Sequence, residues 1–227
     1  IIKDATIIGE AAFNRCDGFA TVNFGSSLTN IGKDAFMDCE GLTKITFASN
    51  AVEFSLGVFR NCINLNDIVL PVNTTKIGDY MFYNCEYLEE IPEDFDNGFI
   101  SWVHNTYSSN YYPTVYAANS LFYNCYRLKR VASNFINHNI SRDSANEYPY
   151  SSSYSKPAHR FPYNLFNNCY NLREVVDMDV FPSSYNTPWG SGNSFKDTFK
   201  NCYMLSRVTF KKGSRAVEGQ TIDLSTV

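Results

Sequence analysis

The seven cysteines are the residues of this chain best suited to chemistry, and all seven occur in one pattern. Each lies three residues after a phenylalanine and three residues before an apolar residue. The pairs are Phe13/Cys16, Phe36/Cys39, Phe59/Cys62, Phe82/Cys85, Phe122/Cys125, Phe166/Cys169 and Phe199/Cys202. A cysteine can serve as a metal ligand, half of a disulfide, a nucleophile or a small core residue. Sevenfold repetition argues against catalysis, because an active site needs its nucleophile only once.

The pattern favours a structural file of buried, reduced thiols made of Cys16, Cys39, Cys62, Cys85, Cys125, Cys169 and Cys202. A zinc site needs clustered ligands, whereas no Cys-x-x-Cys occurs and the three histidines lie far from the cysteines in sequence. Equivalent positions on stacked repeats lie about 5 Å apart, wider than the roughly 3.8 Å that a disulfide prefers between Cβ atoms. A disulfide stays the alternative. We expect a serine in this file to bury a hydroxyl with no partner.

An asparagine directly precedes the cysteine in five of the seven copies. A short amide at this position can bond backbone groups of a neighbouring repeat, so we expect a structural role. The five residues are Asn61, Asn84, Asn124, Asn168 and Asn201, whereas Arg15 and Asp38 interrupt the series.

Large aromatic residues outside the pattern are the candidate binding residues. They gather in three insertions at about residues 93–116, 133–160 and 177–194, which also hold His104, His138 and His159. Tyr and Trp among Ser and Asn are typical of binding surfaces. The candidates are Trp102, Tyr111, Tyr112, Tyr148, Tyr150, Tyr154 and Trp189. The alternative is that these rings only pack the loops against the core.

A repeat of 23 residues positions all of these groups. The first four cysteines are 23 residues apart, and the later gaps of 40, 44 and 33 residues equal 23 plus 17, 21 and 10. Such a period is the signature of a solenoid whose units bury their apolar faces against one another. We expect the insertions to begin just after one strand of consecutive coils and therefore to form one composite surface.

Each repeat predicts a strand, a turn, a second short strand and a helical or 3₁₀ turn. Phe36, Cys39 and Leu42 are three residues apart, as on one side of a helical turn. Alternation follows, as in Val22/Phe24, which indicates a strand with one buried face. Ile-Gly pairs such as Ile31-Gly32 predict the second strand, with glycine turning the chain out of it. We expect the copies before Phe122 and Phe199 to lack this element.

The outward strand positions form a column of charges that alternate in sign at most steps. Opposite charges on neighbouring strands stabilise a sheet by a few tenths of a kcal/mol each. The column predicts a solvated face that pairs with itself: Thr21, Lys44, Asp67, Glu90, Arg130, Glu174 and Arg207.

Composition excludes several function classes. A formal net charge of −4 gives no electrostatic reason to expect a nucleic-acid partner. No apolar run approaches the roughly 20 residues that cross a bilayer, so we predict no membrane span in this chain. We interpret residues 1–227 as a single solenoid domain and, because Ile1 begins in mid-repeat, as a fragment of a longer protein. No motif indicates a cofactor.

The unit L-T-K-I-T-F followed by I-G-K-D-A-F-M-D-C resembles the BspA-like leucine-rich repeat of bacterial and some protist surface proteins. The resemblance covers all seven units and is closest between Ile8 and Leu88. It implies a right-handed, curved leucine-rich-repeat solenoid that is extracellular or attached to a cell surface. It also implies a non-enzymatic module for adhesion or for binding a host or microbial protein, with no catalytic residues. Glycan binding by the loop aromatics and an architectural spacer are the alternative functions.

Overall fold

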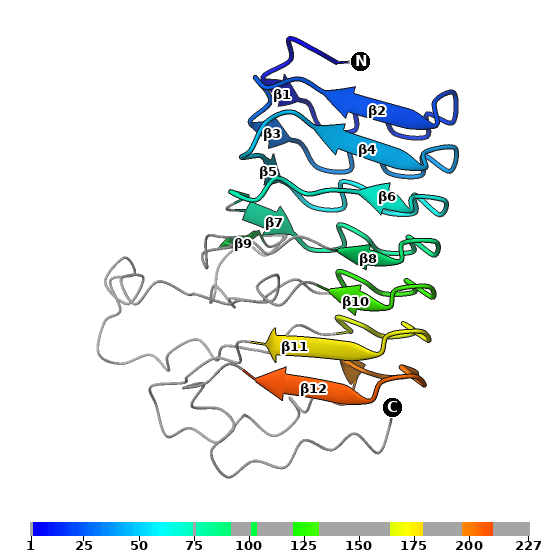
Figure 1. The fold of residues 1–227 in the computed structure, drawn as a ribbon. Coiled ribbons are helices and arrows are strands. Elements are labelled where there is room, and N and C mark those ends of the chain that lie inside the picture. Colours follow the sequence, from blue (N-terminus) through cyan, green and yellow to red (C-terminus); the bar gives the residue numbers. More distant parts are fainter. Residues whose placement is uncertain are drawn as a thin grey trace, which may run out of the picture.

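The computed structural model describes residues 2–74, 76–91, 101–103, 120–131, 164–178 and 197–210, with the backbone alone at 101–103, 176–178 and 210. They form two columns of short strands stacked along one axis (Figure 1). The first column holds β2 (Thr21–Phe24), β4 (Lys44–Phe47), β6 (Asp67–Ile68), β8 (Glu90–Ile91), β10 (Arg130–Val131), β11 (Glu174–Met178) and β12 (Arg207–Phe210). The second holds β1 (Ile7–Ile8), β3 (Asn30–Ile31), β5 (Glu53–Phe54), β7 (Lys76–Gly78) and β9 (Ser101–Val103). The predicted solenoid of stacked parallel strands is confirmed.

Each coil of the solenoid passes through one Phe-x-x-Cys-x-x-apolar segment and then enters a strand of the first column. We call these seven segments, each from its Phe to the apolar residue six positions later, the turn edge. The chain reaches the first column from the right-hand side of Figure 1. The coils are numbered 1 to 7 by their cysteines, which are Cys16, Cys39, Cys62, Cys85, Cys125, Cys169 and Cys202.

The first column consists of two parallel sheets, β2-β4-β6 and β8-β10-β11-β12. The register places the predicted charged residues opposite one another, and Arg130 lies 3.6 Å from Glu90 across two strands. The division between the sheets falls between β6 and β8, where the column brings two carboxylates, Asp67 and Glu90, into succession. Like charges in neighbouring strands oppose pairing. Pro71 follows β6 at the position where Ala48 donates its N–H to the preceding coil, and because proline has no N–H, the pairing of β6 with β4 is limited to two residue pairs.

The second column corrects the expected position of the first insertion. β9 pairs in parallel with β7, and Trp102 lies opposite Ile77. In coils 1 to 4 the Phe lies six residues after the first residue of the second-column strand, whereas 21 residues separate Ser101 from Phe122. Coil 5 therefore keeps the strand it was expected to lack. Most of its extra residues follow this strand instead of the first-column strand.

The turn edge differs from the expected helical turn. The Cys N–H bonds to the Phe carbonyl three residues earlier, as at Cys62 and Phe59 at 3.1 Å. The residue before each cysteine, however, has a positive φ near 60°, as at Asn61. A positive φ at the third position is typical of a type II β-turn and is incompatible with a 3₁₀-helix. The segment is therefore a series of β-turns that also bond backbone groups of the next coil.

One continuous core lies between the two columns and the turn edge. The phenylalanines of the repeat stack along the axis with centroid distances of 5.0 to 6.0 Å between neighbouring coils. Five of the apolar residues three positions after the cysteines are fully buried, as at Leu65 and Leu128. Each coil thus contributes the same three inward side chains, and neighbouring coils cover one another.

The glycine of the Ile-Gly pair in the second-column strand is required because the backbone of the preceding coil leaves no room for a Cβ atom. It is not required for a turn. A Cβ on Gly78 would lie 2.4 Å from the carbonyl carbon of Ser55 in the preceding coil. Its φ is not among the positive values found in this chain. The expectation that glycine supplies an unusual backbone conformation was therefore wrong at this position. Close approach of two coils is the reason for the small residue.

Candidate functional site

Most of the predicted binding residues lie outside the described residues. These are Tyr111, Tyr112, Tyr148, Tyr150, Tyr154 and Trp189, together with all three histidines. Trp102 is described by its backbone, which belongs to β9 and continues the strand register of Ile77. Trp102 therefore occupies a position of the repeat itself, and its assignment to a loop was wrong. The binding role of these seven residues stays a prediction.

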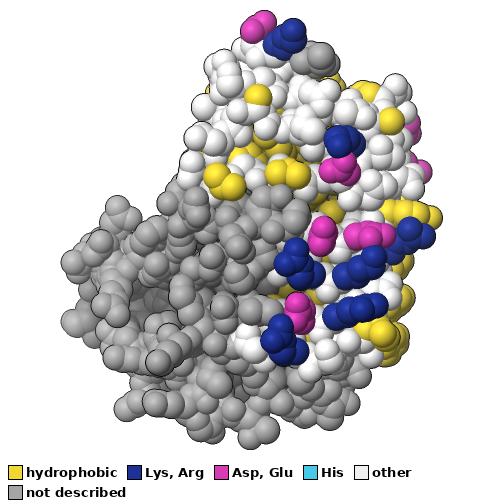
Figure 2. All heavy atoms as spheres, in the orientation of Figure 1, with side chains coloured by type: hydrophobic (Ala, Val, Ile, Leu, Met, Phe, Trp, Pro, Cys, Tyr) yellow, Lys and Arg dark blue, Asp and Glu magenta, His cyan; other side chains and the backbone are white. Residues whose placement is uncertain are grey.

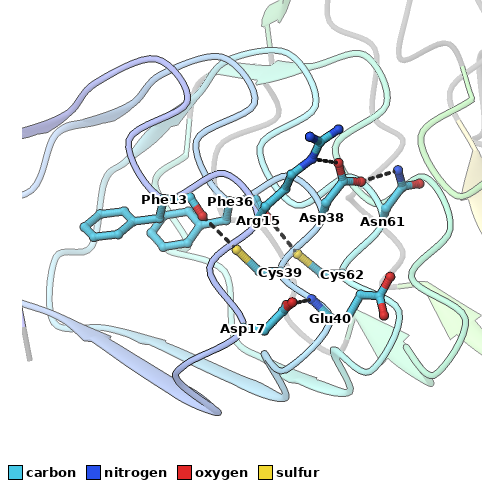
Figure 3. A network of polar contacts seen from close by, with 9 residues as sticks. All are labelled: Phe13, Arg15, Asp17, Phe36, Asp38, Cys39, Glu40, Asn61 and Cys62. Atoms are coloured by element: carbon cyan, nitrogen blue, oxygen red, sulfur yellow. Dashed lines mark hydrogen bonds and ion pairs between the residues drawn. The ribbon is translucent and has the colours of Figure 1, made fainter.

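The thiols form a file in which each links two coils. Cys39 donates to the Phe13 carbonyl at 3.0 Å, and Cys62 donates to the Phe36 carbonyl at 3.0 Å (Figure 3). The same contact of 3.1 to 3.2 Å recurs in every later coil. Six of the seven thiols are buried, and all seven are free. At each buried cysteine a Phe carbonyl oxygen lies within hydrogen-bond distance. A serine hydroxyl in place of the thiol would therefore have an acceptor, and the expectation that it would lack a partner was wrong.

Burial makes these thiols poor nucleophiles. Loss of solvent raises the pKa of Cys39 from 9.0 to about 11 and that of Cys202 to about 12. It raises the pKa of Cys62, Cys85 and Cys169 well above the ordinary value. A reactive cysteine needs the opposite, namely a lowered pKa and access to solvent. The six buried thiols are therefore structural.

The residues before the cysteines form a ladder of side-chain hydrogen bonds. Each amide donates to the amide oxygen of the preceding coil at 2.7 to 2.8 Å, from Asn201 back to Asn61. The ladder ends at the Asp38 carboxylate, which accepts from Asn61 at 2.7 Å and from Arg15 at 3.4 Å (Figure 3). The expected bonds to backbone groups were thus wrong. Asparagine suits this position because it tolerates a positive φ and its amide both donates and accepts.

Metal binding finds no support among the described residues, which contain no group of three or more His, Cys, Asp or Glu side chains that could hold an ion. In the same part of the chain no helix has the length and apolar character needed to cross a membrane.

The outward position after each cysteine changes its chemistry along the solenoid. Coils 1 to 4 carry Asp17, Glu40, Ile63 and Glu86 there, and coils 5 to 7 carry Tyr126, Tyr170 and Tyr203. The three tyrosine rings stack, with centroids 5.0 and 5.5 Å apart. Exposure rises along the stack to 38% at Tyr170 and 68% at Tyr203. A second stack, Tyr83 on Tyr123 at 4.9 Å, lies on the other side of the asparagine ladder.

Cations accompany the tyrosines on coils 5 to 7. Figure 2 shows Lys and Arg side chains gathered over strands β8 to β12. The exposed ones are Arg127, Lys129, Arg130, Arg173, Lys200 and Arg207. The carboxylates of these coils whose burial is described, Glu174 and Asp197, are only half-exposed. Among the described residues Arg173 and Lys200 have no ion-pair partner, whereas Lys129 bonds Glu89 at 2.6 Å and Arg127 lies 4.1 Å over the Tyr87 ring.

The charges of the whole sequence are divided in the same way, with acidic residues prevailing in the first part and basic residues in the second. Residues 1–100 carry 15 acidic and 6 basic side chains, a formal net charge of −9. Residues 101–227 carry 8 acidic and 13 basic side chains, a net charge of +5, and the two parts give the total of −4. The net charge alone conceals this division. Comparing the halves, together with the residue after each cysteine, would have indicated the tyrosine and cation surface from sequence.

Fold and repeat define this chain as a leucine-rich repeat protein. Solved structures with the same architecture include a leucine-rich repeat protein of T. pallidum, with a TM-score of 0.53 and 18% identity over 89% of this chain and 72% of that chain. One from Bacteroides ovatus has a TM-score of 0.50 and 24% identity, over 90% of this chain and 46% of that one. A leucine rich cell surface protein of Faecalibacterium prausnitzii has a TM-score of 0.51 and 19% identity, over 90% and 58%. At these identities the likeness concerns the fold.

The comparison with sequence families gives a more specific result than the comparison of folds. Residues 1–112 match the model of the BspA type leucine rich repeat region in six copies. Residues 1–112 therefore consist of leucine-rich repeats of the BspA type, as the resemblance predicted for this part of the chain. It spans about half the length of the Bacteroides and Faecalibacterium chains. No curated protein matches it.

Proposed function

We propose that this chain is a non-enzymatic binding module at a cell surface, which holds a protein partner along the turn edge of coils 4 to 7. The BspA-type repeat and the surface location named for the Faecalibacterium protein support the location. The chemistry of the edge supports the binding role.

The stacked tyrosines Tyr126, Tyr170 and Tyr203, of which Tyr170 and Tyr203 are exposed, carry the proposal. Exposed apolar area of this kind is not needed to close a coil, because coils 1, 2 and 4 have a carboxylate at the same position. Tyrosine gives a rigid contact surface with one polar group, and arginine adds a charged donor. Met204 beside the stack is 52% exposed and extends its apolar surface. Residues of these types dominate the energetics of protein interfaces.

The geometry of the stack favours a protein over a glycan at this edge. Sugars bind aromatic residues through the face of the ring, but each ring face inside the stack already lies against the next ring at 5.0 or 5.5 Å. Inside the stack the ring edges and the hydroxyl groups of Tyr126 and Tyr170 are what remain for a partner, because the Tyr203 hydroxyl donates to Asn201 at 3.2 Å. They suit the mixed polar and apolar contacts of a protein surface.

The predicted aromatic residues Trp102, Tyr111, Tyr112, Tyr148, Tyr150, Tyr154 and Trp189 form a second proposed part of the binding surface. Their support is composition alone, and the tyrosine stack does not depend on them.

The test measures binding of the labelled protein to a panel of intact microbial and epithelial cells. The double variant Tyr170→Ser/Tyr203→Ser should lower the apparent affinity by about tenfold or more, because a few aromatic anchors carry most interface energy. Its fold should persist, since an exposed aromatic pair contributes only about 0.5–1.5 kcal/mol. Ile7→Ser is the matched control, because Ile7 is 63% exposed on coil 1, away from the tyrosines.

Treating the cells separates the classes of partner. Binding that disappears after protease treatment and survives periodate oxidation of sugars supports a protein partner. The reverse sensitivity supports a glycan instead. Equal binding by the wild type and the double variant would remove the turn edge from the proposal.

A further inference from the structure

We propose that the protein held by the turn edge is a second copy of this chain, lying antiparallel to the first. This inference rests on the proposed function and names its partner. It would make the module a homotypic one, joining chains on one cell or on two. Three features of the described residues support it.

First, the residues directly after the seven cysteines form a series along the solenoid. This series is complementary to the same series running in the opposite direction on a second copy. Two antiparallel copies related by a two-fold axis at coil 4 bring coil 1 against coil 7, coil 2 against coil 6 and coil 3 against coil 5. Asp17 then faces Tyr203, and Glu40 faces Tyr170. A phenol hydroxyl donates to a carboxylate, so the contact of Tyr170 with Glu40 is favourable. The Tyr203 hydroxyl already donates to Asn201 at 3.2 Å, and Asp17 Oδ1 already accepts from the Glu40 and Gly41 N–H groups, so the Asp17 contact needs the Tyr203 hydroxyl to turn towards the second carboxylate oxygen. Ile63 faces Tyr126 and completes an apolar contact between them.

Second, the charges of the two ends are opposite. Among the described residues the exposed charged groups of coils 5 to 7 are cations. In the turn edge of coils 1 and 2 the exposed Asp17 and Glu40 outnumber one exposed cation, Arg15, which is paired with Asp38. Arg173 of coil 6 has no ion-pair partner among the described residues and would lie beside Glu40 of the other copy. An antiparallel arrangement satisfies both ends at once, whereas a parallel one would place like charges together.

Third, the centre of the edge can accept the two-fold axis. Glu86 meets its own copy there, which is the one repulsive step of the column. Arg127 lies next to it in each copy, because the Arg127 N–H bonds the Glu86 carbonyl at 3.2 Å. The Arg127 guanidinium lies over Tyr87, which is exposed. A guanidinium on each side of the axis offsets the repulsion between the two carboxylates.

The size of the edge makes the expected dimer weak. Seven coils at about 4.8 Å per coil give an edge about 30 Å long and only one turn wide. Such a contact falls at the low end of specific interfaces, below about 1,200 Å² in total. Its ionic part should respond strongly to salt. Many copies displayed on a surface would compensate for low affinity by acting together.

The test is sedimentation equilibrium of the full chain at about 50 mM and about 500 mM salt. We expect a monomer–dimer equilibrium at low salt that shifts towards monomer at high salt. Arg173→Glu and Glu40→Lys should each weaken the dimer by about tenfold or more, because each places like charges together twice per dimer. The double variant Arg173→Glu/Glu40→Lys should restore association. Lys3→Glu makes the same change of charge on an exposed residue of coil 1 outside the edge and should leave the dimer within about twofold of wild type.

Three results would overturn the inference. A monomer at every concentration up to about 1 mM excludes the second copy. The proposed function would survive that result if cell binding still depended on Tyr170 and Tyr203. If neither Arg173→Glu nor Glu40→Lys changes the dimerisation affinity, the dimer forms through another surface. Failure of the double variant to restore association excludes the antiparallel pairing.

Discussion

At the scale of single residues, each buried cysteine links two coils through one hydrogen bond. The thiol fills the small space between the Phe and Leu columns and donates to a carbonyl of the preceding coil, as Cys125 does to Phe82 at 3.1 Å. That carbonyl lies inside the stack, where water does not reach it. Cysteine is thus both a small apolar residue and a weak donor at this position.

The thiols predict that the domain loses stability in alkali. Burial raises the pKa of all six buried thiols, that of Cys39 from 9.0 to about 11 and that of Cys202 to about 12. Above pH 9 an unfolded thiol loses its proton while the folded one keeps it. The contribution of the thiols to the free energy of unfolding should therefore be constant below pH 8 and should fall as pH rises from 9 towards 11. The fall approaches about 1.4 kcal/mol per pH unit for each thiol.

Urea denaturation between pH 7 and pH 11 measures this dependence. Cys125→Ser provides the control, because a hydroxyl does not titrate in this range and the slope should decrease by the share of one thiol. The same midpoint of unfolding at pH 8 and at pH 10.5 would contradict the burial of the file.

At the scale of elements, the turn edge owes its shape to positive φ at two positions of the coil. One is the residue before the cysteine, where asparagine occurs in five coils, and the other, in coils 1 to 6, lies two residues before the phenylalanine. These conformations let alternate N–H groups bond within the turn and across to the next coil, as Phe59 does to Met81 at 3.1 Å. The turns therefore continue the inter-coil bonding of the strands.

Variants of Asn124 separate the ladder from the backbone conformation. Asn124→Gly keeps the positive φ of 61° but removes one hydrogen bond donated to Asn84 and one accepted from Asn168. We expect a loss of about 1–3 kcal/mol for the two bonds. Asn124→Ala should lose about 1–2 kcal/mol more, because a Cβ disfavours this φ. Thermal and urea unfolding measure both losses, and two variants as stable as the wild type would show that the ladder contributes nothing.

At the scale of the whole molecule, much of the fold could be predicted because the same pattern of residues recurs in every repeat. The register of Phe, Cys and Leu predicted the core, and alternation predicted the first-column strands. The second strand of coil 5 was missed because its sequence, Ser101–Val103, has no Ile-Gly pair and precedes a long stretch before Phe122. The tyrosine stack was missed because its residues are separated by 44 and 33 positions in sequence, from Tyr126 to Tyr170 and on to Tyr203. Only the stacking of coils brings them together.

The claim that the turn edge of coils 4 to 7 is the binding surface can be tested by site-specific photo-crosslinking on intact cells. A photoreactive phenylalanine replaces Asn171, which is exposed between Tyr170 and Leu172, or Ser27, which is exposed on the opposite half of the solenoid. We predict a protein adduct from position 171 that the Tyr170→Ser/Tyr203→Ser variant abolishes, and little or no adduct from position 27. Equal adducts from both positions, or an adduct from position 27 alone, would contradict the assignment of the binding surface.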